Sequence, residues 1–263
     1  ERHAIGVRGR DLQPFVVDFA ADPLLAVYGD DRHGKSTFIA NMVRSVVANR
    51  SGAEEVMVMV FDRSRELAGV TGHLTEPDPV NPEAANDYYE TNFTAMAQRI
   101  ESLAQILDSR TPSEDLTWEQ KRDWTFEGPL IYLVVDDLDA IPAQVTMHAA
   151  VPAGGPPNVG SGIPVQVWQP LLRHIPNAQD VGLRIIFTHR ANGAGLVELT
   201  QNSVPGQFAT QGAQRILLAS QDSNDKIAGM KFEKDLPPGR GFAMTSAEDN
   251  RGYVQLAAAA GGM

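Results

Sequence analysis

The chain lacks cysteine, long apolar runs and any excess of positive charge. With no cysteine among its 263 residues, it can form neither a disulfide framework nor a thiolate metal site. No apolar run approaches the roughly 18 residues that a membrane-spanning helix needs. The net charge of -11 opposes a broad nucleic-acid surface, because such surfaces are normally basic. The length suits one large domain or two small ones.

Two classes of catalytic site also find no support. The six histidines show no H-x-x-x-H or comparable metal-binding spacing, and no G-x-S-x-G nucleophile elbow occurs. The first residues, ERHAIGVRGRD, do not form a signal peptide, because no apolar segment follows the charges. Since the chain also begins without Met, we expect residues 1–263 to be one domain of a longer protein.

Short apolar runs alternate with helical segments over most of the length. The runs predict strands within 3–8, 15–20, 23–29, 55–62, 129–137, 183–189, 214–220, 239–246 and 251–257. Continuous apolar runs such as EVMVMVFD and LIYLVVDD are typical of a parallel sheet that is covered on both faces. The alternation predicts an α/β fold with three layers, α/β/α, around a mostly parallel sheet.

The helices are predicted from periodicity and end signals. Apolar residues from Ile39 to Val47 recur at helical spacing. A second, long helix is predicted to open at Asn81-Pro82, with one apolar stripe from Tyr89 to Leu107. Thr117 and Gln120 resemble a capping box, and a further helix is predicted around Trp168. The segment 142–164 is rich in Pro, Gly and Ala and is predicted to be a long loop.

The stretch YGDDRHGKSTF contains the phosphate-binding pattern G-x-x-x-x-G-K-[ST]. In such a loop, backbone N–H groups and the positive end of the following helix hold the phosphates. Lys35 would reach the β and γ phosphates, and Ser36 would bind Mg²⁺. A surface glycine turn is the alternative, but a strand before and a helix after disfavour it. The predicted nucleotide-binding residues of the loop are Gly29, Asp30, Asp31, Arg32, His33, Gly34, Lys35, Ser36 and Thr37.

Two acidic residues within this loop are unexpected beside an anion. Only the backbone of the variable positions needs to face the phosphates, so the carboxylates of Asp30 and Asp31 can point to solvent. Arg32 and His33 supply partial compensation nearby. Like charges within about 8–10 Å are poorly screened, so we expect weakened rather than abolished nucleotide affinity.

The run LIYLVVDD ends in a second candidate element of the site. An apolar strand that ends in an aspartate is typical of a Walker B motif, and Asp136 would hold the Mg²⁺ ion. Many such ATPases carry a glutamate at the next position, where it polarises the attacking water. Asp137 is one methylene shorter, and a displacement of 1 Å can cost on the order of 100-fold in rate. Nucleotide binding is therefore better supported than turnover.

The strand RIIFTH supplies the last candidate. In P-loop ATPases of this plan, a polar residue at the end of the neighbouring strand senses the γ-phosphate. Thr188 occupies that position. An ordinary strand exit remains an equal alternative for this residue.

Several stretches together resemble a known family. DPLLAVYGDDRHGKST, VMVMVFDRSREL, LIYLVVDDLD and DVGLRIIFTHR resemble, in order, the core motifs of FtsK/SpoIIIE-type ATPases. IGVRGRDLQPFVVDF, LLRHIPNAQDVGLRIIFTHR and DLPPGRGFAM are similar to the last ATPase domain of the EccC family of type VII (ESX) secretion. The resemblance runs over nearly the whole chain.

The resemblance implies a RecA-like fold, ATP and Mg²⁺ as cofactors, and a cytoplasmic domain of a larger protein anchored in a cell-membrane complex. It also implies three partners: the C-terminal signal of Esx (WXG-type) substrates, other ATPase domains of the same chain, and further copies in a ring. Rings of this class use an arginine from a neighbour, for which Arg190 and Arg240 are both candidates.

Two functional alternatives stay open beside a substrate-recognising secretion ATPase. One is an FtsK-type DNA translocase, which the acidic charge opposes. The other is a scaffold that binds no nucleotide. For substrate recognition, the segment 142–164 and the helix around Trp168 are the candidate surface, and the competing interpretation is that Trp168 is part of the core.

Overall fold

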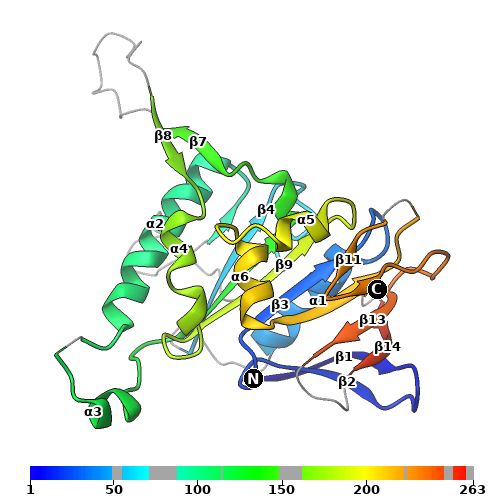
Figure 1. Cartoon of the computed structure of the whole chain (residues 1–263), viewed down its shortest axis with the longest axis horizontal. Helices are drawn as coiled ribbons and strands as arrows, with labels where there is room; N and C mark the ends of the chain where they lie inside the picture. The colour runs from blue at the N-terminus through cyan, green and yellow to red at the C-terminus, as the bar shows by residue number, and fades with distance from the viewer. Residues whose placement is uncertain are drawn as a thin grey trace.

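A ten-stranded mixed sheet forms the centre of the molecule (Figure 1). The computed structural model describes residues 1–48, 55–70, 88–113, 115–147, 162–221, 224–245 and 251–258. In order across the sheet, the strands are β2 (Pro14–Asp18), β1 (Arg2–Arg8), β14 (Gly252–Leu256), β13 (Arg240–Met244), β10 (Gln214–Leu218), β3 (Leu24–Tyr28), β9 (Leu183–His189), β6 (Leu130–Asp136), β4 (Val56–Asp62) and β5 (Tyr89–Glu90).

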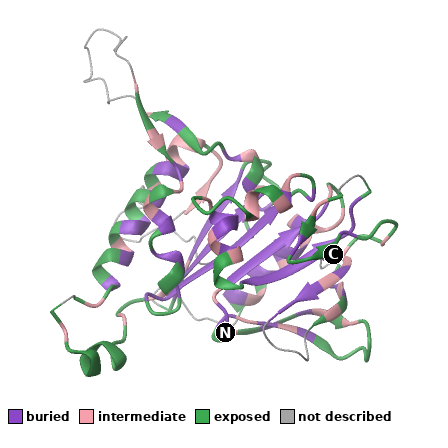
Figure 2. Ribbon diagram, in the orientation of Figure 1, coloured by how far each residue is buried: buried purple, intermediate pink, exposed green. Residues whose placement is uncertain are grey.

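The sheet has a parallel half and an antiparallel half. From β10 to β5 every neighbouring pair is parallel, whereas β2, β1, β14, β13 and β10 pair antiparallel. All residues of β3 and β9 are buried, as continuous apolar runs predict for strands covered on both faces. Figure 2 shows these central strands as the buried interior of the fold.

Helices cover both faces of the parallel half. On one face, α1 (Lys35–Ala48) packs its buried side chains against Leu25, Val27 and their neighbours. The other face, which includes Tyr28 and Phe187, is covered by α2 (Phe93–Arg110), α4 (Gln169–Leu172) and α6 (Val204–Gln211). Successive strand residues therefore enter opposite cores, as a period of two requires. The predicted three-layer α/β/α architecture is confirmed.

Short elements connect and extend these layers. A capping box between Thr117 and Gln120 opens α3 (Trp118–Arg122), as predicted. A 3-10 turn, η3 (Leu138–Ala140), follows β6 directly. The remaining short elements are η4 (Ile175–Asn177), α5 (Ala194–Glu198) and two small hairpins, β7 (Gln144–Met147) with β8 (Ile163–Gln166) and β11 (Lys226–Ile227) with β12 (Met230–Lys231).

Two predicted elements need correction. Tyr89 lies in β5 rather than in a helix, because its strand pairs with β4 and its hydroxyl donates to Asp62. The helix begins only after Asn92, whose side chain accepts the Thr94 and Ala95 N–H groups. The predicted opening at 81–82 lies outside the described residues.

The predicted loop 142–164 is wrong at both ends, where β7 and β8 form an antiparallel hairpin. Val145 of β7 is buried against the core. Residues 148–161 lie outside the described part. Trp168 is partly buried against the same core, with its ring 6.2 Å from that of Phe61. None of the helices within the described ranges has both the length and the apolar character required to cross a bilayer.

Candidate nucleotide site

The candidate site residues meet at the carboxyl edge of the parallel strands. The loop 29–34 joins β3 to α1, while Asp136 ends β6 and Thr188 lies near the end of β9. Since β3, β9 and β6 are neighbours in the sheet, these three points lie side by side. Crevices at this edge are the usual ligand sites of open α/β sheets.

Backbone geometry requires the two glycines of the loop. A Cβ on Gly29 would meet the Leu218 Cβ at 2.7 Å, so a larger residue cannot fit beside β10. Gly34 has φ +99°, a conformation that L side chains rarely adopt. The non-glycine residue Arg32 also has a positive φ, of 64°. The loop is thus tightly curled directly before the N-terminus of α1, where successive N–H groups can point at an anion.

The two loop aspartates behave differently from each other. Asp31 is exposed, as expected, and its Oδ1 lies 3.5 Å from Lys35 Nζ. Asp30 does not point to solvent: its carboxylate accepts from the Ser220 hydroxyl at 2.9 Å and from the Gln221 N–H at 2.8 Å. Asp30 therefore fastens the loop to the end of β10, and this corrects the expectation that both carboxylates are free.

Lys35 is buried, with only 5% of its surface exposed. Its Nζ donates to the carbonyl oxygens of Gly29 at 3.1 Å and Asp30 at 3.2 Å. The same ammonium lies 3.7 Å from Asp137 Oδ1. A buried ammonium needs such compensation. Because the carbonyl contacts are replaceable, Lys35 can exchange them for phosphate oxygens.

Asp136 is almost fully buried and only half satisfied. Its Oδ1 accepts from the Thr188 hydroxyl at 2.6 Å, whereas Oδ2 has no hydrogen-bond partner among the described residues. Burial raises the pKa of Asp136 to about 6; Thr188 and Ser36 oppose the rise, and Asp137 adds to it. A buried carboxylate oxygen without a donor calls for a cation.

The donor set fits Mg²⁺ rather than a softer metal. The Asp136 carboxylate and the Ser36 hydroxyl supply oxygen ligands, and Mg²⁺ commonly takes one or two protein ligands beside water and substrate phosphates. Within the described ranges there is no cluster of three or more His, Cys, Asp or Glu residues that could hold an ion alone. An ion here would therefore depend on a bound phosphate.

Asp137 has a strained backbone. Its φ of 50° and ψ of 63° lie in the left-handed region, which Asp tolerates better than most residues. The backbone N–H of Asp137 stabilises this conformation by donating to the Thr188 hydroxyl at 2.7 Å. Burial raises the pKa of Asp137, Lys35 lowers it, and Asp139 and Asp31 raise it further. The turn directs the carboxylate toward Lys35 and the cleft.

Thr188 links the two acidic residues. Its hydroxyl donates to Asp136 and accepts from the Asp137 backbone, and the residue is fully buried. Thr188 thus fixes the Asp136 carboxylate and the Asp137 backbone. The sequence predicts that Thr188 contacts a γ-phosphate. For that contact, the Thr188 hydroxyl would have to give up its hydrogen bond to Asp136, and this role stays a prediction.

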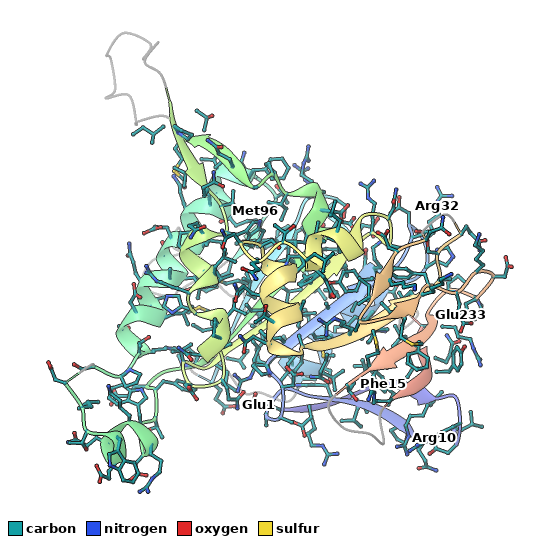
Figure 3. The ribbon with its side chains drawn as sticks, in the orientation of Figure 1. Glu1, Arg10, Phe15, Arg32, Met96 and Glu233 are labelled. Atoms are coloured by element: carbon teal, nitrogen blue, oxygen red, sulfur yellow. The ribbon has the colours of Figure 1, made fainter. Side chains whose placement is uncertain are left out.

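The two candidate arginines lie in different places. Arg190 lines the cleft of its own chain. Its side-chain Nε lies 3.0 Å from Asp139 Oδ2, and its backbone N–H donates to Asp139 Oδ1 at 3.1 Å. Arg240 lies in β13 near Tyr253, apart from the described lining of the cleft. Figure 3 shows Arg32 at the margin of the molecule, in keeping with its exposure.

A polar cleft of about 470 Å³ lies against the loop, and neither Asp136 nor Thr188 is among the described residues that line it. The predicted residues in its lining are Asp31, Arg32, Gly34, Lys35, Ser36, Thr37, Asp137 and Arg190. The sequence predictions missed Glu66, Pro238 and Asp139: the first two line the cleft and the third holds Arg190. Glu66 follows β4, and its loop is fixed by Asp62, which accepts from Ser64, Tyr89 and the N–H groups of Arg65 and Leu67. The resemblance of VMVMVFDRSREL to a family motif pointed to this segment, but it did not identify Glu66.

An apolar pocket lies on the other side of the turn after Asp137. It measures about 210 Å³ and lies between η3, α4 and the segment 197–205. Leu196 and Leu199 beside it are 71% and 79% exposed. Its lining includes Leu138, Asp139, Ile141, Trp168, Leu172, His189, Val197 and Val204.

Comparisons with known proteins agree with this geometry. No protein-family model matches the chain. The ESX-3 secretion system protein EccC3 of Mycobacterium tuberculosis is 32% identical over 252 residues, 96% of this chain and 17% of that protein. The chain thus spans about a sixth of the length of this relative.

Two solved structures share the fold. The cytoplasmic domain of the type VII secretion ATPase EccC of Thermomonospora curvata has a TM-score of 0.77 at 23% identity, over 98% of this chain and 26% of that chain. A structure of ATPases 2 and 3 of the same protein, in complex with a signal sequence peptide, gives 0.75 at 23% identity over 98% and 40%. By sequence and by fold, the chain belongs with the FtsK/SpoIIIE-like ATPase domains of the EccC family of type VII secretion.

Proposed function

We propose that this domain binds Mg·ATP in the polar cleft. The strongest support is the pairing of a buried lysine, held by carbonyl and carboxylate oxygens, with a buried Asp136 oxygen that has no hydrogen-bond partner in the described part of the chain. Phosphate oxygens would replace the carbonyl contacts of Lys35. A Mg²⁺ ion would occupy the space between Ser36 and Asp136, where it would neutralise phosphate charge.

Turnover by the isolated domain is proposed to be slow. Asp137 is the candidate base that orients the attacking water, but it is shorter than glutamate and lies 3.7 Å from Lys35. The nearby carboxylates of Asp139 and Asp31 disfavour the ionised form of Asp137 and raise its pKa. An arginine supplied by a neighbour can contribute 10³–10⁵ in rate, so a monomer lacks much of the catalytic power of a ring.

The direct test of binding is a thermal-unfolding series with Mg·ATP. A ligand that binds only the folded state raises the melting temperature with its concentration. We expect a rise that continues with the logarithm of the Mg·ATP concentration through the millimolar range and that EDTA reduces. An unmoved melting curve would reject nucleotide binding and favour a scaffold.

We further propose that the apolar pocket receives the C-terminal signal of Esx (WXG-type) substrates. Amphipathic helical tails insert apolar anchors at i, i+3 or i+4 into such grooves. The exposed Leu196 and Leu199 extend the apolar surface beyond the pocket, and such surfaces mark protein contacts. The T. curvata neighbour was solved with a signal sequence peptide, which supports this class of ligand.

This proposal is tested by titrating a labelled Esx C-terminal peptide against the domain. Affinity should be modest, because the tail becomes ordered on binding. It should change little with salt, since the contact is apolar. Absence of saturable binding at high micromolar concentration, to the domain or to its multimer, would remove substrate recognition from its function.

The remaining partner proposals follow from the family. We propose that residues 1–263 form a single domain of a larger, membrane-anchored protein and lie on the cytoplasmic side. Its partners there would be other ATPase domains of the same chain and further copies in a ring. The net charge of -11 disfavours the alternative, a DNA translocase. Duplex binding with a steep salt dependence would revive that alternative.

A further inference from the structure

Glu66 brings a further carboxylate to the polar cleft, which it lines together with Lys35, Asp137 and Arg190. It is exposed, and among the described residues it has neither a hydrogen-bond nor an ion-pair partner for its side chain. The two other acidic residues in the described lining differ: the carboxylates of Asp31 and Asp137 lie 3.5 Å and 3.7 Å from Lys35 Nζ. The cleft thus holds one carboxylate that the lysine does not contact.

The backbone on both sides of Glu66 is fixed by Asp62, the fully buried last residue of β4. Asp62 Oδ1 accepts from the Arg65 N–H at 2.9 Å, and Oδ2 accepts from the Leu67 N–H at 2.7 Å. Two hydroxyl groups also donate to this carboxylate, both at 2.8 Å. One buried acid therefore holds the residue before Glu66 and the residue after it.

The neighbours of Glu66 in the loop point elsewhere. Leu67 is buried in the core beneath α1. The guanidinium of Arg63 lies over the Phe93 ring at the start of α2, 5.5 Å from its centre. Of residues 63–67, Glu66 alone is among the described residues that line the cleft. The loop after β4 therefore presents one functional side chain to the cleft, from a fixed backbone.

Glu66 borders the cleft from the side opposite to the phosphate-binding loop. That loop follows β3, and two strands, β9 and β6, separate β3 from β4 in the sheet. Asp62 is the register partner of Asp136, so the segments that begin with Arg63 and Asp137 leave the sheet side by side. The carboxylates of Asp137 and Glu66 thus come from adjacent strand exits, whereas Lys35 comes from α1.

This placement suits the attacking water of ATP hydrolysis. The proposed nucleotide rests its β and γ phosphates on the loop 29–34 and Lys35. Because the attacking and leaving oxygens are roughly in line in phosphoryl transfer, the water must approach the γ-phosphate from the side away from the loop. An ionised carboxylate on that side accepts hydrogen bonds only, so it turns a water's hydrogens toward itself and the lone pair toward phosphorus.

We propose that Glu66 orients the attacking water together with Asp137 and takes up its proton. The inference rests on the proposed Mg·ATP binding and deepens it with a second carboxylate. The water oxygen forms a bond to the γ-phosphorus, and the bond from this phosphorus to the β–γ bridging oxygen breaks, so that ADP leaves with the electron pair. The proton passes to Glu66 and then to solvent. Asp137 takes it less readily, because the Lys35 ammonium is 3.7 Å away.

The test is Glu66→Gln, which keeps the size of the side chain but cannot take up a proton. Phosphate release is followed in a single turnover of Mg·ATP with the domain in excess, and calorimetry gives the affinity. We expect release about 100-fold slower, the low end of what a positioned base contributes. Mg·ATP affinity should stay within about threefold or become tighter, because a negative charge leaves the cleft. Glu119→Gln on the exposed α3 is the matched control and should behave as the wild type.

A double variant tests whether the two carboxylates act on the same water. Removing either one leaves the water misplaced, and residues that act as a unit have non-additive effects on rate. Glu66→Gln combined with Asp137→Asn should therefore be no more than about twofold slower than the slower single variant. Losses that multiply would show two independent roles and contradict the shared water.

The other outcomes separate this inference from the binding proposal. A wild-type rate in Glu66→Gln would overturn it, and so would a loss of Mg·ATP affinity of about tenfold or more, which would make Glu66 a binding residue. If the wild-type domain binds Mg·ATP but releases phosphate no faster than Mg·ATP in buffer does, the role of Glu66 fails while nucleotide binding stands. If it does not bind Mg·ATP, both fail.

Discussion

The polar cleft and the apolar pocket lie beside one short turn, yet the cleft is mainly polar and the pocket mainly apolar. Asp137 lines the cleft, whereas the next residue, Leu138, lines the apolar pocket. The left-handed backbone of Asp137 makes this possible, since it turns the chain sharply as β6 ends. One strand exit thereby borders both the proposed anion site and the apolar pocket.

Asp139 is shared between the two regions. It lines the apolar pocket, and its carboxylate holds Arg190, which lines the cleft. The two regions are thus adjacent but differ in character. Charged side chains dominate the cleft, whereas the pocket combines aliphatic and aromatic carbon with Asp139, His189 and a few amide and hydroxyl groups. Variants that affect one region and spare the other test whether each has its own ligand.

The largest effect is expected from Lys35→Ala. This change removes the cation that we propose faces the β and γ phosphates, and it leaves Asp31 and Asp137 without their contact to the Lys35 ammonium. We expect Mg·ATP affinity to fall by about 100-fold or more, since hydrogen bonds to charged groups contribute about 1.5–3 kcal/mol each. Calorimetry measures the loss, with Lys231→Ala on the exposed hairpin as a matched control. Wild-type ATP affinity in the Lys35 variant would contradict the role of the cleft, while tail-peptide affinity should remain unchanged.

The next effect is a pH dependence confined to the cleft. Burial raises the pKa of Asp136 to about 6, and Mg²⁺ requires the ionised carboxylate. As the pH falls through 6, Asp136 takes up a proton, so Mg·ATP affinity should drop about tenfold between pH 7 and pH 5. Peptide affinity should stay level over the same range.

Asp136→Asn provides the control for this pH dependence, because ATP itself also takes up a proton in this range. Its remaining pH dependence belongs to the nucleotide, and the difference between the two proteins belongs to Asp136. Identical pH profiles for the wild type and Asp136→Asn would contradict the assignment of Asp136 as the metal ligand.

On the apolar side, Val197→Asp should weaken the Esx tail peptide about tenfold, because it places an unpaired charge against the bound apolar face. Fluorescence titration of the labelled peptide measures the change, and Val7→Asp in β1 makes the same substitution far from the pocket. Mg·ATP affinity should be unaffected. Equal peptide binding by the Val197 and Val7 variants would show that the peptide binds outside this pocket.

The smallest effect is expected from Asp137→Glu. The longer side chain reaches further into the cleft while Mg·ATP affinity stays the same. We expect a several-fold higher rate of phosphate release, measured in a coupled assay, because small displacements of a catalytic group are costly. Fast hydrolysis by the monomeric wild-type domain would contradict the account of Asp137 as a limiting residue.

The sequence predicted most strands and the strand–loop–helix arrangement around the candidate site, because these depend on local pattern. The loop 29–34 follows β3, and Asp136 ends the otherwise apolar β6; apolar continuity identifies buried parallel strands. The start of α2 was misplaced because β5 is held by a distant partner, Asp62, rather than by its own residues.

Features that depend on contacts between distant segments could not be predicted. The binding of the Asp30 carboxylate to Ser220 joins residues 190 positions apart. Nothing near Pro238 in the sequence indicates that it lines the phosphate cleft, since this requires the antiparallel half of the sheet to fold back onto α1. The hairpin of β7 and β8 was likewise hidden by its Pro- and Gly-rich connection.

Hydrogen–deuterium exchange with each ligand tests the division between the two regions most directly, because it shows which backbone amides each ligand protects. We predict that Mg·ATP slows exchange at residues 31–37 and leaves residues 166–172 unchanged, whereas the Esx tail peptide protects residues 166–172 and spares the loop. Protection of residues 166–172 by Mg·ATP alone, or of the loop by the peptide alone, would contradict the assignment of separate ligands to the cleft and the pocket.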